Sequence, residues 1–174
     1  MKITKRTFLI VLLNIFVMPF LTFNVNNDIV FAEIETGVSV GQKASPFKLL
    51  SIDGKELDLR SFGDGKVTLL VFGATWCPAC KHEVPLLKEY YNEFKDDGLE
   101  VLNIDIQETE RKVRSFVEKN QINYSVVLDS KAEVAMLYKV VGIPLNIIFD
   151  KNGIIKYREN RPPSKETLEK LLAN

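Results

Sequence analysis

The sequence predicts an α/β fold with a mixed central sheet, and three patterns indicate it. The runs 67–72 and 101–106 are apolar almost throughout, as expected for strands that are buried on both faces. Between them, residues 77–95 repeat apolar side chains at spacings of three and four, which is typical of a helix. Near the C-terminus, two apolar runs flank 150–153, Asp-Lys-Asn-Gly, which favours a hairpin turn. The first three segments form a β–α–β unit, and the hairpin adds antiparallel strands.

The other predicted elements are a second hairpin, a strand and three helices. In chain order they are expected at 47–52 with 55–59, around 113–117, at 124–128, around 133–138 and at 164–172. Asp53-Gly54 suits the turn of the N-terminal hairpin. Ser130 and Glu133 have the spacing of a capping box, and Ser164 is placed to cap the last helix.

Residues 1–32 differ from the rest and predict an export leader. Lys2, Lys5 and Arg6 precede a nearly continuous apolar run at 8–23, and Val30-Phe31-Ala32 ends in a small residue that a signal peptidase can cut. The run is shorter than the roughly 20 residues of a membrane span, so a cleaved signal and a retained membrane anchor both remain open. The basic flank comes first, so the domain should face the outside of the cytoplasm in either case.

Beyond the leader, residues 33–45 are expected to be a connector and 46–174 a single domain, which we expect to be monomeric. The chain has 23 Lys and Arg and 23 Asp and Glu, and a formal net charge of zero. These charges are intermixed along the sequence, so nucleic acid is not an expected partner.

The two cysteines of the chain, Cys77 and Cys80, lie together just after a predicted strand. On a helix that begins at Cys77, residues i and i+3 share a face and can close or open a disulfide with little backbone movement. Pro78 fits the first turn of that helix. The unsatisfied N–H groups there favour a thiolate, so Cys77 is the predicted nucleophile. Cys80, expected to be the more buried, would be the resolving thiol.

Other interpretations of the pair are less consistent with the sequence. A structural disulfide across so short a loop would stabilise the fold little. A metal site needs three or four ligands, and only His82 could join the two cysteines. We therefore expect no metal and no separate cofactor, because the thiols can carry the electrons themselves.

Several motifs together resemble the thioredoxin superfamily, and within it the extracytoplasmic thiol-disulfide oxidoreductases of the TlpA and ResA type. They are 72–80 (Phe-Gly-Ala-Thr-Trp-Cys-Pro-Ala-Cys), Pro85, 141–144 (Val-Gly-Ile-Pro), 149–150 (Phe-Asp) and Gly153. The resemblance extends from about Val38 to the C-terminus. It implies a thioredoxin-like three-layer fold with a mixed central sheet, an N-terminal hairpin extension and an inserted helix–strand segment.

The resemblance also assigns roles to single residues. Pro144 matches the cis-proline beside the active-site disulfide, and with Ile143, Trp76 and Pro78 it would bind the substrate. Glu83 matches a glutamate that acts as an acid/base group. Thioredoxin carries a buried aspartate where this chain has Val71, so Glu83 is one candidate for its task; a solvated surface charge is the alternative.

The predicted function is an extracytoplasmic protein-disulfide reductase, which could act on the Cys-x-x-Cys-His site of apocytochromes c. The partners implied are a disulfide-containing exported protein and a membrane thiol donor of the CcdA/DsbD type. Two alternatives stay open: an oxidase or isomerase of exported proteins, and a copper- or zinc-binding chaperone that uses Cys77, Cys80 and His82. Ala79, Leu145 and Asn146 depart from the common family pattern.

Overall fold

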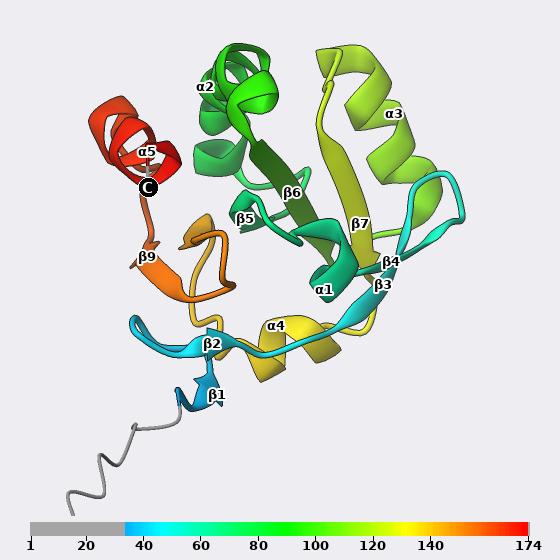
Figure 1. The fold of residues 1–174 in the computed structure, drawn as a ribbon. Coiled ribbons are helices and arrows are strands. Elements are labelled where there is room, and N and C mark those ends of the chain that lie inside the picture. Colours follow the sequence, from blue (N-terminus) through cyan, green and yellow to red (C-terminus); the bar gives the residue numbers. More distant parts are fainter. Residues whose placement is uncertain (1–33, 174) are drawn as a thin grey trace, which may run out of the picture. The chain divides into compact units, whose positions relative to one another are not determined.

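A seven-stranded mixed sheet lies at the centre of the protein in the computed structural model, which describes residues 34–173 (Figure 1). The predicted leader, 1–32, lies outside the described residues. The strand order is β4-β3-β7-β6-β5-β8-β9. The strands are β3 (Lys48–Ser51), β4 (Glu56–Asp58), β5 (Val67–Gly73), β6 (Leu99–Ile106), β7 (Ser125–Asp129), β8 (Leu145–Phe149) and β9 (Ile155–Glu159). Strands β5, β6 and β7 are parallel to one another, and the other pairings are antiparallel, so the sheet is mixed as expected.

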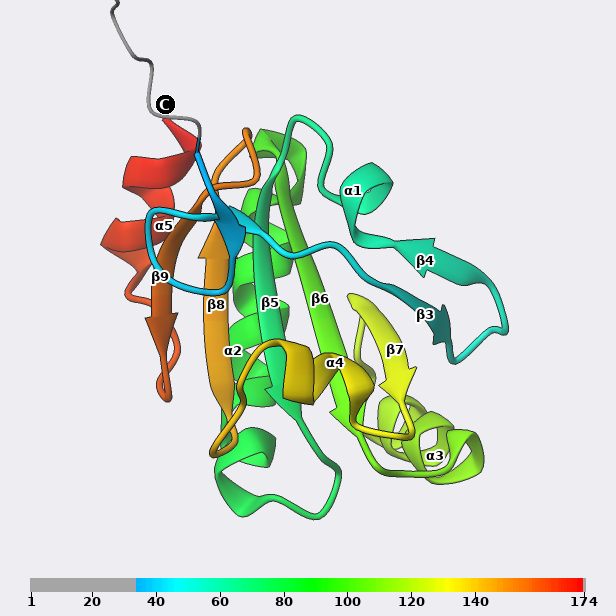
Figure 2. The same ribbon diagram turned by 90° about the horizontal axis from the view of Figure 1, so that it is seen from below.

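Helices cover both faces of the sheet and complete three layers. They are α1 (Leu59–Phe62), α2 (Pro78–Phe94), α3 (Glu110–Asn120), α4 (Glu133–Leu137) and α5 (Lys165–Leu172), with a short 3₁₀ turn, η1 (Lys95–Asp97), after α2. One face is covered by α2, α3 and α5, whereas α4 and α1 lie over the other (Figures 1 and 2). No helix within 34–173 combines the length and apolar character needed to cross a membrane.

The sheet separates two hydrophobic cores. On the side of α2, α3 and α5, the core contains Leu87, Val113 and Leu168 packed on the β5 and β6 side chains. On the other side, Tyr138 is fully buried and its ring contacts those of Phe47 and Phe72. Strand β5 contributes to both cores and is buried along its whole length. The continuous apolar run in its sequence follows from that central position.

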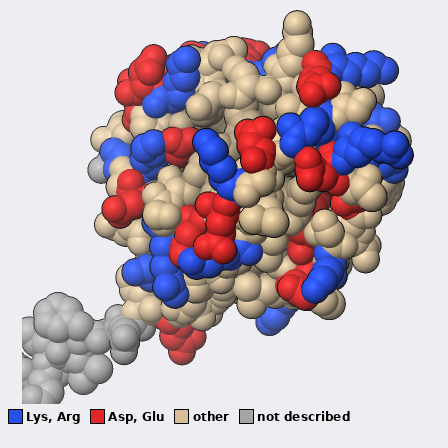
Figure 3. Space-filling view, turned by 90° about the vertical axis from the view of Figure 1, so that its right-hand side faces the viewer, with Lys and Arg blue, Asp and Glu red and all other residues tan. Residues whose placement is uncertain are grey.

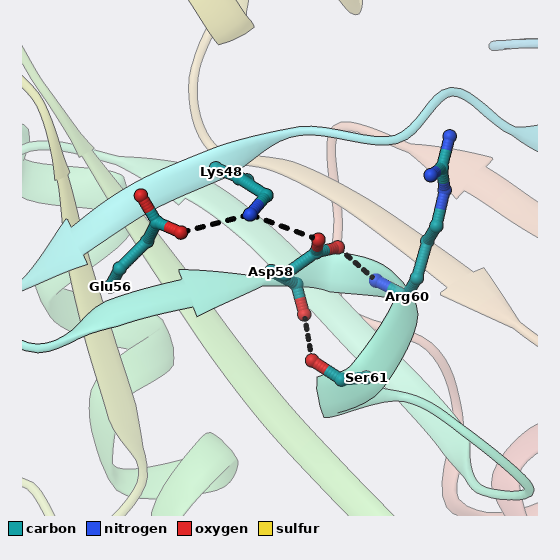
Figure 4. A network of polar contacts seen from close by, with 5 residues as sticks. All are labelled: Lys48, Glu56, Asp58, Arg60 and Ser61. Atoms are coloured by element: carbon teal, nitrogen blue, oxygen red, sulfur yellow. Dashed lines mark hydrogen bonds and ion pairs between the residues drawn. The ribbon is translucent and has the colours of Figure 1, made fainter.

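The N-terminal hairpin forms as predicted, but its second strand is shorter than expected. Asp58 ends β4 because its Oδ1 accepts the backbone N–H of Arg60 at 2.9 Å and so caps helix α1, which the sequence had not indicated (Figure 4). Lys48 bridges the hairpin, with its Nζ 2.9 Å from Glu56 and 3.6 Å from Asp58. Lys48 and Glu56 are largely exposed, so their ion pair contributes little to stability.

The segment 33–45, expected to be a connector, is part of the packed domain in the residues that are described. It contains the paired short strands β1 (Thr36–Gly37) and β2 (Lys43–Ala44). Gly41 donates its N–H to the Ile155 carbonyl, and Ile155 donates to the Gln42 carbonyl, both at 2.9 Å. Val38 is buried in the core on the α4 side. The segment therefore packs against the antiparallel strand β9, at the edge of the sheet.

The cap of α4 differs from the capping box that the sequence suggested. Ser130 Oγ does not cap the helix but reaches the Glu108 carbonyl at 3.5 Å. The buried Asp129 accepts the backbone N–H of Ala135 through Oδ2 at 2.7 Å instead. The capping-box prediction is wrong because Ala132 takes a left-handed conformation (φ 58°), which shifts the helix start away from Ser130.

Acidic and basic side chains are intermixed on the molecular surface. On the face shown in Figure 3, Lys and Arg alternate with Asp and Glu, and neither sign dominates. That face therefore offers no basic stripe of the kind that binds nucleic acid.

Candidate active site

Cys77 and Cys80 lie where the central strand β5 gives way to helix α2, and they form a disulfide with Cα atoms 5.3 Å apart. Cys77 is the N-cap of α2 and has an extended backbone, and Pro78 occupies the first helical turn as predicted. The pair thus sits at the carboxyl end of a parallel strand, where open α/β sheets usually carry their chemistry.

The start of α2 is built to stabilise negative charge on Cys77. The backbone N–H of Cys80 donates to Cys77 Sγ at 3.2 Å. The sulfur also faces the positive end of a 17-residue helix dipole. Both interactions favour the thiolate once the disulfide is opened, which is the form that attacks a disulfide. The geometry is therefore consistent with Cys77 as the nucleophile.

The relative burial of the two cysteines is the reverse of the prediction. Cys77 is 5% exposed, whereas Cys80 is intermediate. The reason is the loop before β8, which lies over Cys77 and brings the Ile143 carbonyl oxygen to 3.8 Å from its sulfur.

The covering loop contains the expected cis-proline. The Ile143–Pro144 bond is cis, Pro144 is buried and Ile143 is half-buried. Asn160 holds the loop from the end of β9: its Nδ2 donates to the Pro144 carbonyl at 2.7 Å and to the Gly142 carbonyl at 3.1 Å. No sequence pattern pointed to Asn160, because its partners are backbone atoms that the β8–β9 pairing brings near.

Exposed apolar side chains are found on the two loops that meet at Cys77. Trp76 is 61% exposed and Val141 is 100% exposed, while Pro78 also faces solvent. Large apolar side chains left in water at such a site are typical of surfaces that bind other molecules. His82 is exposed on α2.

Glu83 is buried, so its interpretation as a solvated surface charge is wrong. It is 8% exposed, and its Oε2 accepts a hydrogen bond from Asn146 Nδ2 at 3.1 Å. Burial raises the pKa of Glu83 above its ordinary value, and the hydrogen bond from Asn146 offsets part of that effect. Asn146 lies two residues after Pro144, so this hydrogen bond joins Glu83 to the strand that follows the cis-proline. Among the described residues, Glu83 is hydrogen-bonded to this amide and not to a cysteine sulfur.

A second buried glutamate, Glu108, was missed by the sequence analysis. Its two carboxylate oxygens accept from the backbone N–H and the Oγ1 of Thr75, and they fix the loop before Cys77. Lys112 Nζ lies 2.9 Å from Glu108 Oε1 and reaches solvent. Burial alone would raise the pKa of Glu108, but the hydrogen bonds from Lys112 and Thr75 lower it below its ordinary value. Only the tertiary fold reveals this contact, because 33 residues separate Thr75 from Glu108.

A metal centre at this site is not supported by the described part of the chain. Residues 34–173 contain no group of three or more His, Cys, Asp or Glu side chains arranged to hold a metal ion. The disulfide, the helix N-terminus and the cis-proline loop are instead the parts needed for thiol–disulfide exchange.

Comparison with known proteins agrees with this geometry. Residues 40–158 match the model of the AhpC/TSA family. The chain is 31% identical over 138 residues to the thiol-disulfide oxidoreductase ResA of Bacillus thuringiensis subsp. konkukian, and 33% identical over 138 residues to ResA of Geobacillus kaustophilus. Each match covers 79% of this chain and 79% of the relative.

Solved structures show the same fold. The thioredoxin domain of a thiol-disulfide oxidoreductase from Bacteroides vulgatus superposes with a TM-score of 0.71 at 28% identity, covering 78% of this chain and 99% of that one. StoA of Bacillus subtilis superposes with a TM-score of 0.62 at 25% identity, covering 73% and 96%. The family match, the ResA relatives and the Cys77–Cys80 disulfide agree with one another. This chain belongs to the thioredoxin-like AhpC/TSA family, as a thiol-disulfide oxidoreductase of the ResA type.

Proposed function

We propose that this protein reduces the disulfides of exported proteins outside the cytoplasm. The observation that carries the proposal is the position of Cys77 at the N-terminus of α2, beneath the cis-proline loop and beside exposed Trp76. This arrangement favours a thiolate and places it beside exposed apolar side chains. A polypeptide substrate can bind there through apolar side chains of its own.

The proposed reaction is a two-step exchange. The Cys77 thiolate attacks one sulfur of the substrate disulfide; a Cys77–substrate disulfide forms, and the other substrate sulfur leaves as a thiolate. The Cys80 thiol then loses its proton and attacks Cys77 Sγ, so that the Cys77–Cys80 disulfide forms and the second substrate sulfur leaves. Two electrons pass from the enzyme dithiol to the substrate, which ends as a dithiol.

Residues around the cysteines take supporting roles in this proposal. Trp76, Pro78, Ile143 and Pro144 form the surface against which the substrate chain lies. Glu83 is the acid/base group of the exchange. Its burial, raised pKa and hydrogen bond to Asn146 support that role.

The cellular setting of the proposal comes from the sequence. The basic and apolar leader at 1–32 directs the domain across the cytoplasmic membrane, as a cleaved signal or as an anchor through 8–23. No soluble cytoplasmic reductant reaches that side, so the oxidised pair must be reduced again by a membrane thiol protein of the CcdA/DsbD type.

The Cys-x-x-Cys-His segment of apocytochrome c is the substrate proposed, because its two cysteines must be reduced before haem attachment. A Cys80→Ala chain retains the attacking thiol but cannot resolve a mixed disulfide, so it should capture this segment when the two are mixed. Capture that also occurs with Cys77→Ala would contradict the assignment of the nucleophile.

The reduction potential of the Cys77–Cys80 couple tests the direction of electron flow. We expect a strongly reducing value, near or below the roughly −270 mV of thioredoxin. It can be measured by equilibrating the purified domain with dithiothreitol buffers and following Trp76 fluorescence. A value near the roughly −120 mV of a strong oxidant would contradict the reductase proposal and favour an oxidase.

A further inference from the structure

Asp105 is a buried carboxyl on the side of the sheet that faces the active-site helix. It is the last but one residue of β6 and is 3% exposed. Its Oδ1 is buried, and within residues 34–173 it has no hydrogen-bond partner. A buried, unpaired carboxylate oxygen costs free energy, so an aspartate at this position calls for an explanation other than packing.

The sheet register places Asp105 close to Cys80. Asp105 is paired with Gly73 across the parallel β5–β6 ladder, so both residues face the same side. A Cβ atom on Gly73 would lie 3.5 Å from Cys80 Sγ. The resolving sulfur therefore lies over Gly73, the neighbour of Asp105 on the adjacent strand.

A small cavity joins the two groups. Its lining includes Cys80, Asp105, Asn103 and Tyr124, and it leaves about 20 Å³. A single buried water molecule needs a cavity of roughly 10–15 Å³, so one water molecule fits. Asp105 and Asn103 offer polar partners for it. Glu83, although it also lies on α2 and is buried, is not among the lining residues.

A chain of polar groups leads from Asp105 to solvent. Asp105 interacts with Glu108, and Glu108 is bound to Lys112, whose side chain is 62% exposed. The other titratable groups at the cavity are Cys80 and Tyr124; burial and the nearby Glu83 raise the pKa of Tyr124 far above the neutral range. Tyr124 therefore stays neutral, and Asp105 is the group at the cavity that can exchange a proton with Cys80.

We propose that Asp105 accepts the proton of the Cys80 thiol, through one water molecule in this cavity, when Cys80 attacks the mixed disulfide at Cys77. The proton moves from Cys80 Sγ to the water and from the water to the Asp105 carboxylate. The Cys80–Cys77 bond forms, the bond between Cys77 and the partner sulfur breaks, and the partner leaves with the electron pair. Asp105 gives the proton back to solvent after the partner has left.

The acidity of Asp105 suits this exchange. Burial, and then the charge and hydrogen bonding of Glu108, raise the pKa of Asp105 to about 8, against a smaller opposing effect of Lys112. An ordinary thiol has a pKa of about 8.5, so the proton transfer is nearly balanced and can run in both directions. The inference rests on the exchange between Cys77 and Cys80, whichever way electrons flow.

The test separates the two steps by reacting the reduced protein with Ellman's disulfide in a stopped-flow instrument. The attack of Cys77 releases the first coloured thiolate, and the attack of Cys80 releases the second. In Asp105→Asn we expect the second phase to slow by at least about tenfold near neutral pH and to lose its inflection near pH 8. The first phase should change by less than about twofold, because Cys77 retains its helix N-terminus.

Asp129→Asn is the matched control, because Asp129 is an equally buried carboxyl at the end of the next strand and does not line this cavity. Both of its phases should match the wild type. An unchanged second phase in Asp105→Asn would overturn the proposal. This result does not depend on a protein substrate or on the reduction potential, so it stands apart from the test of the reductase function.

If Asp105→Asn does not fold, a measurement on the wild-type protein tests the proposal instead. The Asp105 carboxyl can be titrated by NMR in the oxidised and the reduced protein. We expect a higher pKa of Asp105 after reduction, because a thiolate on Cys80 and a carboxylate on Asp105 would repel each other across the cavity. Equal values in the two states would overturn the proposal.

Discussion

Glu83 and Asp105 are two buried carboxyls beside the active-site helix, and they have different neighbours. Glu83 is hydrogen-bonded to Asn146, on the strand that follows the cis-proline loop over Cys77. Asp105 shares a cavity with Cys80. Both carboxyls are buried, and for both burial is the largest cause of a raised pKa.

For Glu83→Gln we expect a change in the pH dependence of the first, Cys77 phase. The stability of the protein should also respond. A carboxyl whose pKa is raised by folding binds its proton more tightly in the folded state, so its contribution to stability is largest below the ordinary pKa and falls as the pH rises through the folded pKa. Glu83→Gln should therefore gain stability relative to the wild type as the pH rises above the ordinary pKa of a glutamate, about 4.3, measured by urea denaturation.

Glu89→Gln is a suitable control for this variant, since Glu89 lies on the same helix but is exposed. A pH–rate profile of Glu83→Gln that coincides with the wild-type profile would remove Glu83 from the mechanism.

At the scale of single elements, a buried side chain determines where α4 begins. The backbone N–H of Ala135, in the first turn of α4, has no acceptor within the helix, and the Asp129 carboxylate accepts it. Ala135 is packed in the core with Tyr138. The exposed Ser130 has the sequence spacing of a cap but bonds elsewhere. The start of α4 thus depends on the acceptor that the tertiary fold brings to its free N–H groups.

Asp129→Ala should lower the free energy of unfolding by about 1–2 kcal/mol, because it leaves a buried backbone N–H without its acceptor. Ser130→Ala should change it by less than about 0.5 kcal/mol. Urea denaturation of both variants measures the difference. A larger loss in Ser130→Ala than in Asp129→Ala would restore the capping box predicted from the sequence.

For the whole molecule, the segment before the N-terminal hairpin completes the core on the α4 side. Val38 is buried there, and backbone hydrogen bonds join Gly41 and Gln42 to Ile155 on the β9 strand. The same side of the sheet supports the loop that crosses Cys77, through Leu145 at the start of β8. Removing this segment would therefore expose apolar surface of the domain.

A chain that begins at residue 33 should unfold cooperatively and form the Cys77–Cys80 disulfide. A chain that begins at residue 46 should be less stable by at least about 2 kcal/mol, from the loss of a buried valine and of several hydrogen bonds. Thermal and urea unfolding of the two chains measure this difference. Equal stabilities would mean that 33–45 is a connector after all.

Much of the site was predictable because its signals are local. The apolar runs around β5 and β6, Pro78 at the helix start and the spacing of Cys77 and Cys80 each act within a few residues along the chain. The resemblance to a known family added Pro144 and Glu83, which local patterns alone would not have selected. The predicted strands, hairpins and last helix lie where expected, with boundaries that shift by no more than two residues.

The sequence by itself thus determined the fold class and the position of the cysteine pair at the start of a helix, since each depends on neighbouring residues. Only the tertiary structure decided which cysteine is covered, that Glu83 is buried, that Asp129 caps α4, and that Glu108 and Asp105 lie beside the active site. These features depend on how distant strands align. Parallel pairing of β5 with β6 places Asp105 next to Gly73, and nothing in the intervening 31 residues specifies that register locally.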